Sequence, residues 1–171
     1  MKRVLCFLFL IVIAVIIETS FSNTAHAEIQ NNIPSTSAKG MILIEKTTGR
    51  VLAEKNADEQ LSIASTTKIV TALTVLNNCD DIKRVVTIDK KCVGIEGTSI
   101  YLREGEKLSI EDLLHGLMLR SGNDSAVALA YAVGGSIDGF CKMMNETAKN
   151  CGATGCNFTN PHGLEQEGHH C

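Results

Sequence analysis

The sequence has 171 residues, of which 44% are hydrophobic and 20% are charged. This composition is typical of one globular domain and excludes a disordered or fibrous chain. The net charge is −3 and no block of Lys and Arg is present, so neither a nucleic acid nor an anionic membrane surface is indicated as a partner.

The first 27 residues have the pattern of a secretory signal peptide. Lys2 and Arg3 precede an apolar run over residues 4–17, and the segment ends in Ala25-His26-Ala27. A retained anchor is the alternative, but about 14 apolar residues are fewer than the roughly 20 that a membrane-spanning helix needs. We therefore expect cleavage after the last alanine and an exported protein. The remaining residues carry no evidence on membrane association.

Six cysteines follow the expected cleavage site, at positions 79, 92, 141, 151, 156 and 171. An exported protein can form disulfides. A chain of this length does not depend on them, however, and several of these cysteines lie where a helix or strand would bury a small hydrophobic side chain. We expect free thiols, with disulfides of undefined pairing as the alternative.

The ordered domain is expected over residues 40–171, after a flexible lead-in over residues 28–39. Two β-prone runs, 40–45 and 50–56, flank a turn that contains Gly49 and predict a β-hairpin. A helix is predicted next, from Ser65 to about Leu76. Its apolar residues fall on nearly all sides, so we expect it to be buried within the domain.

Helices dominate the second half of the prediction. Residues 84–93 are expected to form a strand and residues 97–108 an irregular segment. Three helices are then predicted, over residues 109–120, 124–135 and 136–152. Ser109 and Asp112 have the spacing of a capping box at the first of them. Strand signals come early and helix signals late, so the sheet that the hairpin begins lacks the closing strands that would cover its edge.

The start of the first predicted helix contains a lysine where helix stability does not favour one. The positive end of the helix dipole opposes the charge of Lys68. Ser65 lies three residues earlier and projects from the same face, within reach of a hydrogen bond. The dipole and burial both lower the pKa of a lysine here, so a neutral amine can take the serine's proton. A helix cap is the alternative role of Ser65.

A second group of polar residues, Ser121-Gly122-Asn123, interrupts two predicted helices. These three residue types also favour turns, so a simple turn is the alternative interpretation. We expect the flanking Arg120 and Asp124 to be solvated or paired at the rim of a cleft.

Together, Ser65-x-x-Lys68 and Ser121-x-Asn123 resemble the first two motifs of the serine enzymes that recognise penicillin. The stretches 41–73, 101–135 and 157–164 resemble the N-terminal part of the low-molecular-weight penicillin-binding proteins, which are D-alanyl-D-alanine carboxypeptidases of the S11 peptidase family. The resemblance implies an α/β fold of the α+β type that is β-lactamase/transpeptidase-like, with an antiparallel sheet packed against helices and an all-helical subdomain.

The resemblance also implies roles for four residues. Ser65 is the expected nucleophile and Lys68 its general base. Ser121 is expected to relay the proton to the leaving amine, and Asn123 to bind the amide backbone of the substrate. The implied partners are peptidoglycan stem peptides that end in D-Ala-D-Ala, with β-lactams as covalent inhibitors. No metal or cofactor is implied.

The third family motif, K-T-G, does not follow Asn123 in this chain. The one Lys-Thr pair, Lys46-Thr47, lies in the predicted hairpin and is followed by Thr48. We therefore expect the chain to correspond to the N-terminal part of the family domain, without its C-terminal strands. A carboxypeptidase is the expected function. A serine β-lactamase and a non-catalytic peptidoglycan-binding fragment are the alternatives.

The last ten residues contain further polar side chains that could suggest other sites. His162, His169, His170 and Cys171 match no zinc-binding spacing, so a polar loop is the expected reading. Glu165 lies in a plain turn and is expected at the surface.

Overall fold

The computed structural model describes residues 36–171, which fall into two compact units, residues 36–57 and 58–171. The expected signal peptide over residues 1–27, and most of the lead-in, lie outside the described residues. Among the helices that the structure describes, none combines the length and the hydrophobicity needed to cross a lipid bilayer.

The first unit is the predicted β-hairpin. Strands β1 (Met41–Ile44) and β2 (Val51–Lys55) pair antiparallel. The turn between them is closed by Glu45, whose carboxylate accepts hydrogen bonds from the hydroxyl and the backbone N–H of Thr48 (2.6 and 2.7 Å). The Thr48 hydroxyl and the neighbouring backbone N–H groups lower the pKa of Glu45 to about 2. Gly49 has φ +71°, the positive value that the predicted turn requires.

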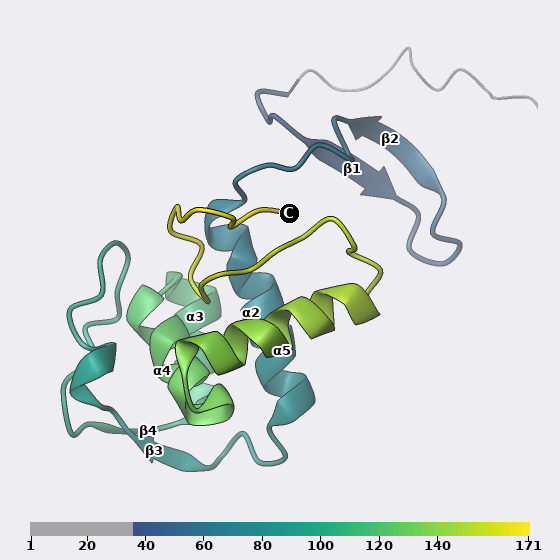
Figure 1. Ribbon diagram of the computed structural model, residues 1–171. Helices are drawn as coiled ribbons and strands as arrows, with labels where there is room; N and C mark the ends of the chain where they lie inside the picture. The colour runs from purple at the N-terminus through teal and green to yellow at the C-terminus, as the bar shows by residue number, and fades with distance from the viewer. Residues whose placement is uncertain (1–35) are drawn as a thin grey trace, which may run out of the picture. The chain divides into compact units, whose positions relative to one another are not determined.

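The second unit is built mainly from four helices (Figure 1). They are α2 (Thr67–Asn78), α3 (Ile110–Arg120), α4 (Asn123–Gly134) and α5 (Ile137–Asn150). The capping box predicted from Ser109 and Asp112 is present at α3, and Ser136 caps α5. The helical part of the prediction is therefore confirmed, with boundaries shifted by one or two residues.

The predicted strand over residues 84–93 is much shorter in the structure. Strand β3 (Val85–Thr87) ends early because the Asp89 side chain accepts a hydrogen bond from the Lys91 backbone (2.9 Å) and starts a 3-10 turn, η3 (Lys90–Cys92). Its partner is β4 (Lys107–Ser109), in a segment expected to be irregular. A three-residue strand that leads directly into a helix carries too short a pattern to be recognised.

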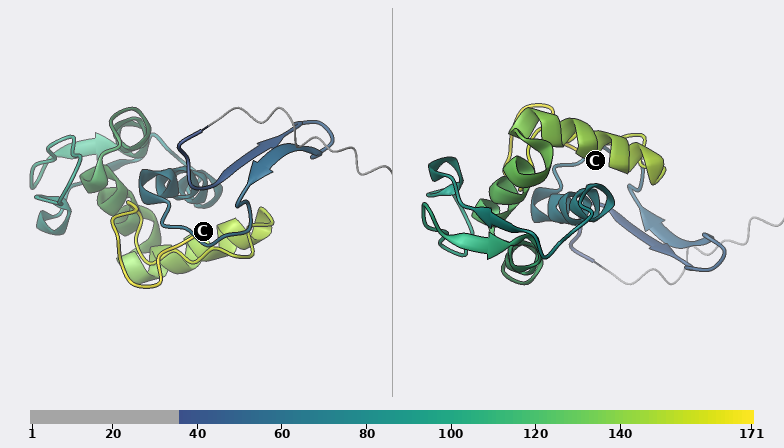
Figure 2. Two further views of the ribbon diagram at one scale, coloured as in Figure 1. Left: turned by 90° about the horizontal axis from the view of Figure 1, so that it is seen from above. Right: turned by 90° about the horizontal axis from the view of Figure 1, so that it is seen from below.

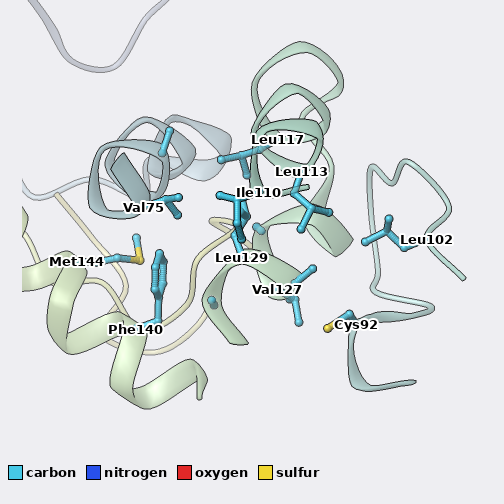
Figure 3. Packing of buried hydrophobic residues seen from close by; sticks show 14 of the residues in the cluster. Val75, Cys92, Leu102, Ile110, Leu113, Leu117, Val127, Leu129, Phe140 and Met144 are labelled. Atoms are coloured by element: carbon cyan, nitrogen blue, oxygen red, sulfur yellow. The ribbon is translucent and has the colours of Figure 1, made fainter. Parts of the chain in front are cut away.

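The core of the second unit lies among the four helices, where side chains from each of them point inward (Figure 3). The residues with almost no exposed surface include Val75, Ile110, Leu113, Leu117, Leu129, Phe140 and Met144. This packing fixes the start of α2 and the junction of α3 and α4, which are the places that carry the two sequence motifs.

Helix α2 is not buried on all sides, so that prediction is wrong. Its buried face consists largely of polar side chains, including Thr67 and Thr71, together with Val75. Ile69 and Leu73 are exposed on the other side. Positions 67, 71 and 75 follow the helical period and share one face. The polar face is buried because hydrogen-bonding groups from elsewhere in the chain lie against it.

Those groups come from residues 156–171, which have almost no regular secondary structure. The views in Figures 1 and 2 place this yellow segment beside the start of α2. Leu61, which precedes η2 (Ala64–Thr66), exchanges backbone hydrogen bonds with Cys171 (3.0 and 3.2 Å). The tail is therefore a packed part of the unit rather than a polar surface loop.

A disulfide joins Cys156 and Cys171, so the expectation of free thiols is wrong for this pair. The remaining described cysteines, at positions 79, 92, 141 and 151, are free. The pair forms because Asn157 and His170 bridge through two backbone hydrogen bonds (2.8 and 3.0 Å), which brings their outer neighbours side by side. Such a contact between distant residues leaves no local signal in the sequence.

Removal of this disulfide is expected to destabilise the second unit. Cys171→Ser opens a closed loop with a sequence separation of 15 residues, and a loop of that size corresponds to about 2–3 kcal/mol of unfolding free energy. Urea unfolding under non-reducing conditions measures the effect. Cys151→Ser, at an exposed free cysteine, is the matched control and should leave the midpoint unchanged. Equal urea midpoints for the two variants would contradict the assignment of a stabilising disulfide to Cys156 and Cys171.

Candidate active site

Ser65 and Lys68 lie at the start of α2 and contact each other as their spacing predicts. Ser65 is exposed in the short turn η2, whereas Lys68 is only 3% exposed. Lys68 Nζ is 3.2 Å from Ser65 Oγ and donates a second hydrogen bond to the backbone oxygen of His162 (2.9 Å). The result is an accessible hydroxyl beside a buried amine.

The surroundings of Lys68 favour its neutral form. Burial lowers the pKa of its amine below the ordinary value, and the first turn of α2 contains no acidic side chain that would oppose this. His162 cannot supply a compensating negative charge, since an imidazole is either neutral or cationic, and burial, together with nearby Lys68 and His169, lowers its own pKa to about 4. Lys68 is thus held by a hydroxyl and a backbone carbonyl, and neither partner supplies the negative charge that would restore the ordinary pKa of the amine.

The backbone before Ser65 is tightly packed. Ala64 has φ +45°, which is uncommon for a residue with a side chain. Gly163 lies directly against it, since a Cβ placed on Gly163 would overlap the Ala64 carbonyl oxygen. The amide of Gly163 is in turn held by Asn160 Oδ1 (2.7 Å). The turn over residues 160–164 therefore fixes the backbone that leads into Ser65.

The second motif lies at the junction of α3 and α4, as predicted. Ser121 ends α3 in the left-handed conformation, with φ +54°. Asn123 begins α4 and is 3% exposed. Its backbone N–H donates to Thr98 O and its side-chain Nδ2 to Glu96 O, both at 2.7 Å. These bonds hold Asn123 against the loop over residues 96–98.

The two motifs border the same turn. Gly97 lies between Asn123 and Leu164, since a Cβ placed there would be 2.6 Å from Asn123 Nδ2 and 3.8 Å from Leu164 Cδ2. Leu164 follows Gly163, which packs on Ala64. Residues 160–164 therefore contact both the segment that carries Ser65 and the loop that holds Asn123. Residues 157–164 were part of the family resemblance, but local sequence patterns predicted only a loop here.

Asp124 was expected to be solvated or paired at the rim of a cleft, but it is 1% exposed, so its expected place at a rim is wrong. Its carboxylate accepts hydrogen bonds from the Ser99 hydroxyl (2.5 Å) and from the backbone N–H groups of Ile100, Leu102 and Ser125 (3.1, 3.0 and 2.9 Å). Burial raises the pKa of Asp124, but these four bonds outweigh it and leave the pKa below 3.8. The carboxylate thus organises the loop that contacts Asn123.

The polar tail contains no metal site within residues 36–171, where no three His, Cys, Asp or Glu side chains are grouped to bind an ion. Its histidines have other contacts. His169 is buried and contacts Thr67, and His170 takes part in the backbone bridge to Asn157. Glu165 is exposed, as expected.

Replacing Asp124 is expected to destabilise the second unit. Asp124→Asn turns an amide toward backbone donors, which should reduce the free energy of unfolding at pH 7 by about 2 kcal/mol or more. The extra free energy of unfolding that the Asp124 carboxylate contributes is fully present above its ordinary pKa of 3.8. It is lost as the pH falls through the lowered pKa that Asp124 has in the folded protein. Unfolding curves measured from pH 7 to pH 3 should therefore converge. Asp80→Asn, at an exposed aspartate, is the control, and an equal loss there would contradict the role of burial.

Comparison with known proteins decides the family. The family model described as D-alanyl-D-alanine carboxypeptidase matches residues 24–171. The chain belongs to the D-alanyl-D-alanine carboxypeptidase family. This confirms the resemblance drawn from the Ser65 and Ser121 motifs.

Curated members of the D-alanyl-D-alanine carboxypeptidase family match most of the chain. DacF of Bacillus subtilis is 39% identical over 137 residues, which are 78% of this chain and 35% of DacF. DacC of Escherichia coli is 40% identical over 159 residues, which are 86% of this chain and 40% of DacC. The chain therefore spans well under half the length of these relatives.

A solved structure of the family confirms the expected fold. Penicillin binding protein 6B from Escherichia coli superimposes with a TM-score of 0.76 and 31% identity, over 81% of this chain and 47% of that protein. The described helices and antiparallel strand pairs thus form part of a penicillin-binding, transpeptidase-like α/β fold.

Proposed function

We propose that the chain contributes the nucleophile and the general base of a serine D-alanyl-D-alanine carboxypeptidase, which removes the terminal D-alanine from peptidoglycan stem peptides. The observation that carries the proposal is the 3.2 Å contact between exposed Ser65 Oγ and buried Lys68 Nζ, in a chain of this family. Membership of the family supports the reaction class, and the contact supports the assignment of these two residues.

In the first step, Ser65 Oγ attacks the carbonyl carbon of the peptide bond between the two D-alanines. Its proton passes to the neutral amine of Lys68, whose other hydrogen bond to His162 O keeps the lone pair directed at the serine. The backbone N–H of Ser65 is the proposed donor to the oxyanion that develops on the attacked carbonyl.

In the second step, the carbon–nitrogen bond breaks and D-alanine leaves with the proton, which Ser121 relays to its amine. Asn123 is proposed to bind the substrate's amide backbone. Its Nδ2 already donates to Glu96 O, so its Oδ1 is the atom we assign to the substrate N–H. Water then hydrolyses the ester on Ser65 and restores the hydroxyl.

No K-T-G triplet follows Asn123 among residues 124–171, so these residues supply no counterpart of the third family motif. Tests of activity therefore use the whole product of the gene that encodes this chain, which is called the full-length protein below. The same acylation is expected with β-lactams, which mimic the scissile amide. A slowly hydrolysed adduct favours the carboxypeptidase, whereas rapid turnover favours a serine β-lactamase.

We also propose that the protein acts outside the cytoplasm. The basic start, apolar run and Ala25-His26-Ala27 ending of residues 1–27 support a cleaved signal peptide, with the lead-in over 28–39 and the family domain from residue 40.

The proposed cleavage site predicts that exported protein begins at Glu28. Secretion from a bacterial host followed by N-terminal sequencing tests this directly. Replacing Ala27 with a bulky residue should block cleavage, because the processing enzyme requires small side chains there. Protein that retains the apolar run in the unaltered chain would show an uncleaved anchor instead.

The proposed chemistry predicts different effects at two residues of the full-length protein. Ser65→Ala should abolish covalent labelling by a fluorescent penicillin. Lys68→Arg should slow labelling by about 100-fold or more, because arginine stays protonated and cannot act as a base. Ser62→Ala, at an exposed serine three residues earlier, is the matched control and should label normally. Unchanged labelling of the Lys68 variant would assign the proton to another group.

A further inference from the structure

Residues 156–171 contact the chain around the proposed nucleophile at five successive places. Cys171 pairs with Leu61 through the backbone, Gly163 packs on Ala64, His169 contacts Thr67, His162 O accepts from Lys68, and Pro161 O accepts from Thr71. Four of these contacts use backbone groups of the segment. His169 is different, because it uses its side chain.

The hydrogen bonds of His169 define the state of its ring. The backbone N–H of Thr159 donates to Nδ1 (3.1 Å), so Nδ1 carries no proton. In the neutral ring the proton then lies on Nε2, which donates to the Thr67 hydroxyl (2.8 Å). The ring also packs edge-on against Phe158, with centroids 5.7 Å apart. His169 is 7% exposed and Thr67 is completely buried.

The neutral ring is the form that these contacts require. Burial lowers the pKa of His169, and nearby His170 lowers it further. Neutral His162 adds no charge on this side. Protonation of Nδ1 would place two donors, the ring and the Thr159 amide, against each other, so the Thr159 bond that orients the ring toward Thr67 belongs to the neutral state.

Thr67 occupies a decisive position, since it lies between Ser65 and Lys68 and is the first residue of α2. The helix start has no side-chain cap, because the N-cap residue Thr66 makes no such bond to the helix. The preceding Ala64 is in an unfavourable backbone conformation, which persists only where the surroundings fix it. The first turn of α2 is therefore held from outside the helix.

We propose that His169 is a positioning residue for acylation: its hydrogen bond to Thr67 holds the first turn of α2 so that Ser65 Oγ and Lys68 Nζ remain in contact. This inference rests on the proposed function, because it takes Ser65 and Lys68 as nucleophile and base. His169 touches neither of them and acts through Thr67.

The test compares four variants of the full-length protein by their rate of acylation with a fluorescent penicillin. His169→Phe keeps the ring volume and loses both hydrogen bonds, whereas His169→Gln keeps a donor for Thr67. Thr67→Val removes only the hydroxyl. We expect His169→Phe and Thr67→Val each to slow acylation by about tenfold or more, and His169→Gln by less than about threefold. The double variant, which combines His169→Phe with Thr67→Val, should slow acylation by no more than either single variant.

A second readout does not depend on catalysis. Lysine labelled with ¹³C at Cε reports the pKa of Lys68 by NMR, with the signal assigned through Lys68→Arg. If the first turn loosens and water enters, the pKa of Lys68 should rise by about 1 or more toward its ordinary value in His169→Phe and in Thr67→Val, but not in His169→Gln. Thermal unfolding confirms that each variant is folded, and Thr67→Val decides the question if His169→Phe is not.

The outcomes separate this inference from the proposed function. If the unaltered protein does not label but the pKa of Lys68 responds as expected, the proposed function is wrong, while the part of this inference that concerns structure, that His169 holds the first turn of α2 through Thr67, stands. If the protein labels and neither the rate nor the pKa changes in folded His169→Phe or Thr67→Val, the positioning role is overturned. Equal losses in His169→Gln and His169→Phe would also overturn it, since ring packing alone would then explain the effect.

Discussion

The buried amine of Lys68 is the group on which the rest of this arrangement depends. A buried ammonium is costly unless an anion is beside it, and the partners here are a serine hydroxyl and the His162 carbonyl. Burial lowers the pKa of this amine, and the structure fixes both of its partners. Ser65 is fixed through the start of α2, and His162 through the turn that packs on Ala64.

The irregular segment over residues 156–171 can pack against a polar helix face because side chains satisfy its backbone. Asn145 of α5 pairs with both backbone groups of Phe158 (2.8 and 3.0 Å), and Asn160 holds the turn that contains His162 and Gly163. Buried backbone groups need such partners when no sheet or helix supplies them. The threonines on the buried face of α2 complete the network, which explains why that face is polar.

The sequence predicted the features that local patterns determine and missed those that depend on distant contacts. Helical periods, the Ser109 cap and the Ser65–Lys68 spacing are set within a few residues, and each is found in the structure. The burial of Asp124 depends on amides more than twenty residues earlier in the chain, and the Cys156 disulfide on a bridge between residues 157 and 170. Neither leaves a periodic signal in the sequence. The position of Asp124 at the start of an Ala-rich helix was the one local indication that this carboxylate has hydrogen-bond donors nearby.

The central claim is that Ser65 is the residue that becomes acylated. The most direct measurement is peptide mass spectrometry of the full-length protein after brief treatment with benzylpenicillin. Tryptic cleavage after Lys55 and Lys68 isolates a peptide that contains both Ser62 and Ser65, and fragmentation distinguishes the two serines. The account predicts a single penicilloyl group on Ser65. An adduct on Ser62 or Ser121, or no covalent adduct in a protein that binds penicillin, would contradict it.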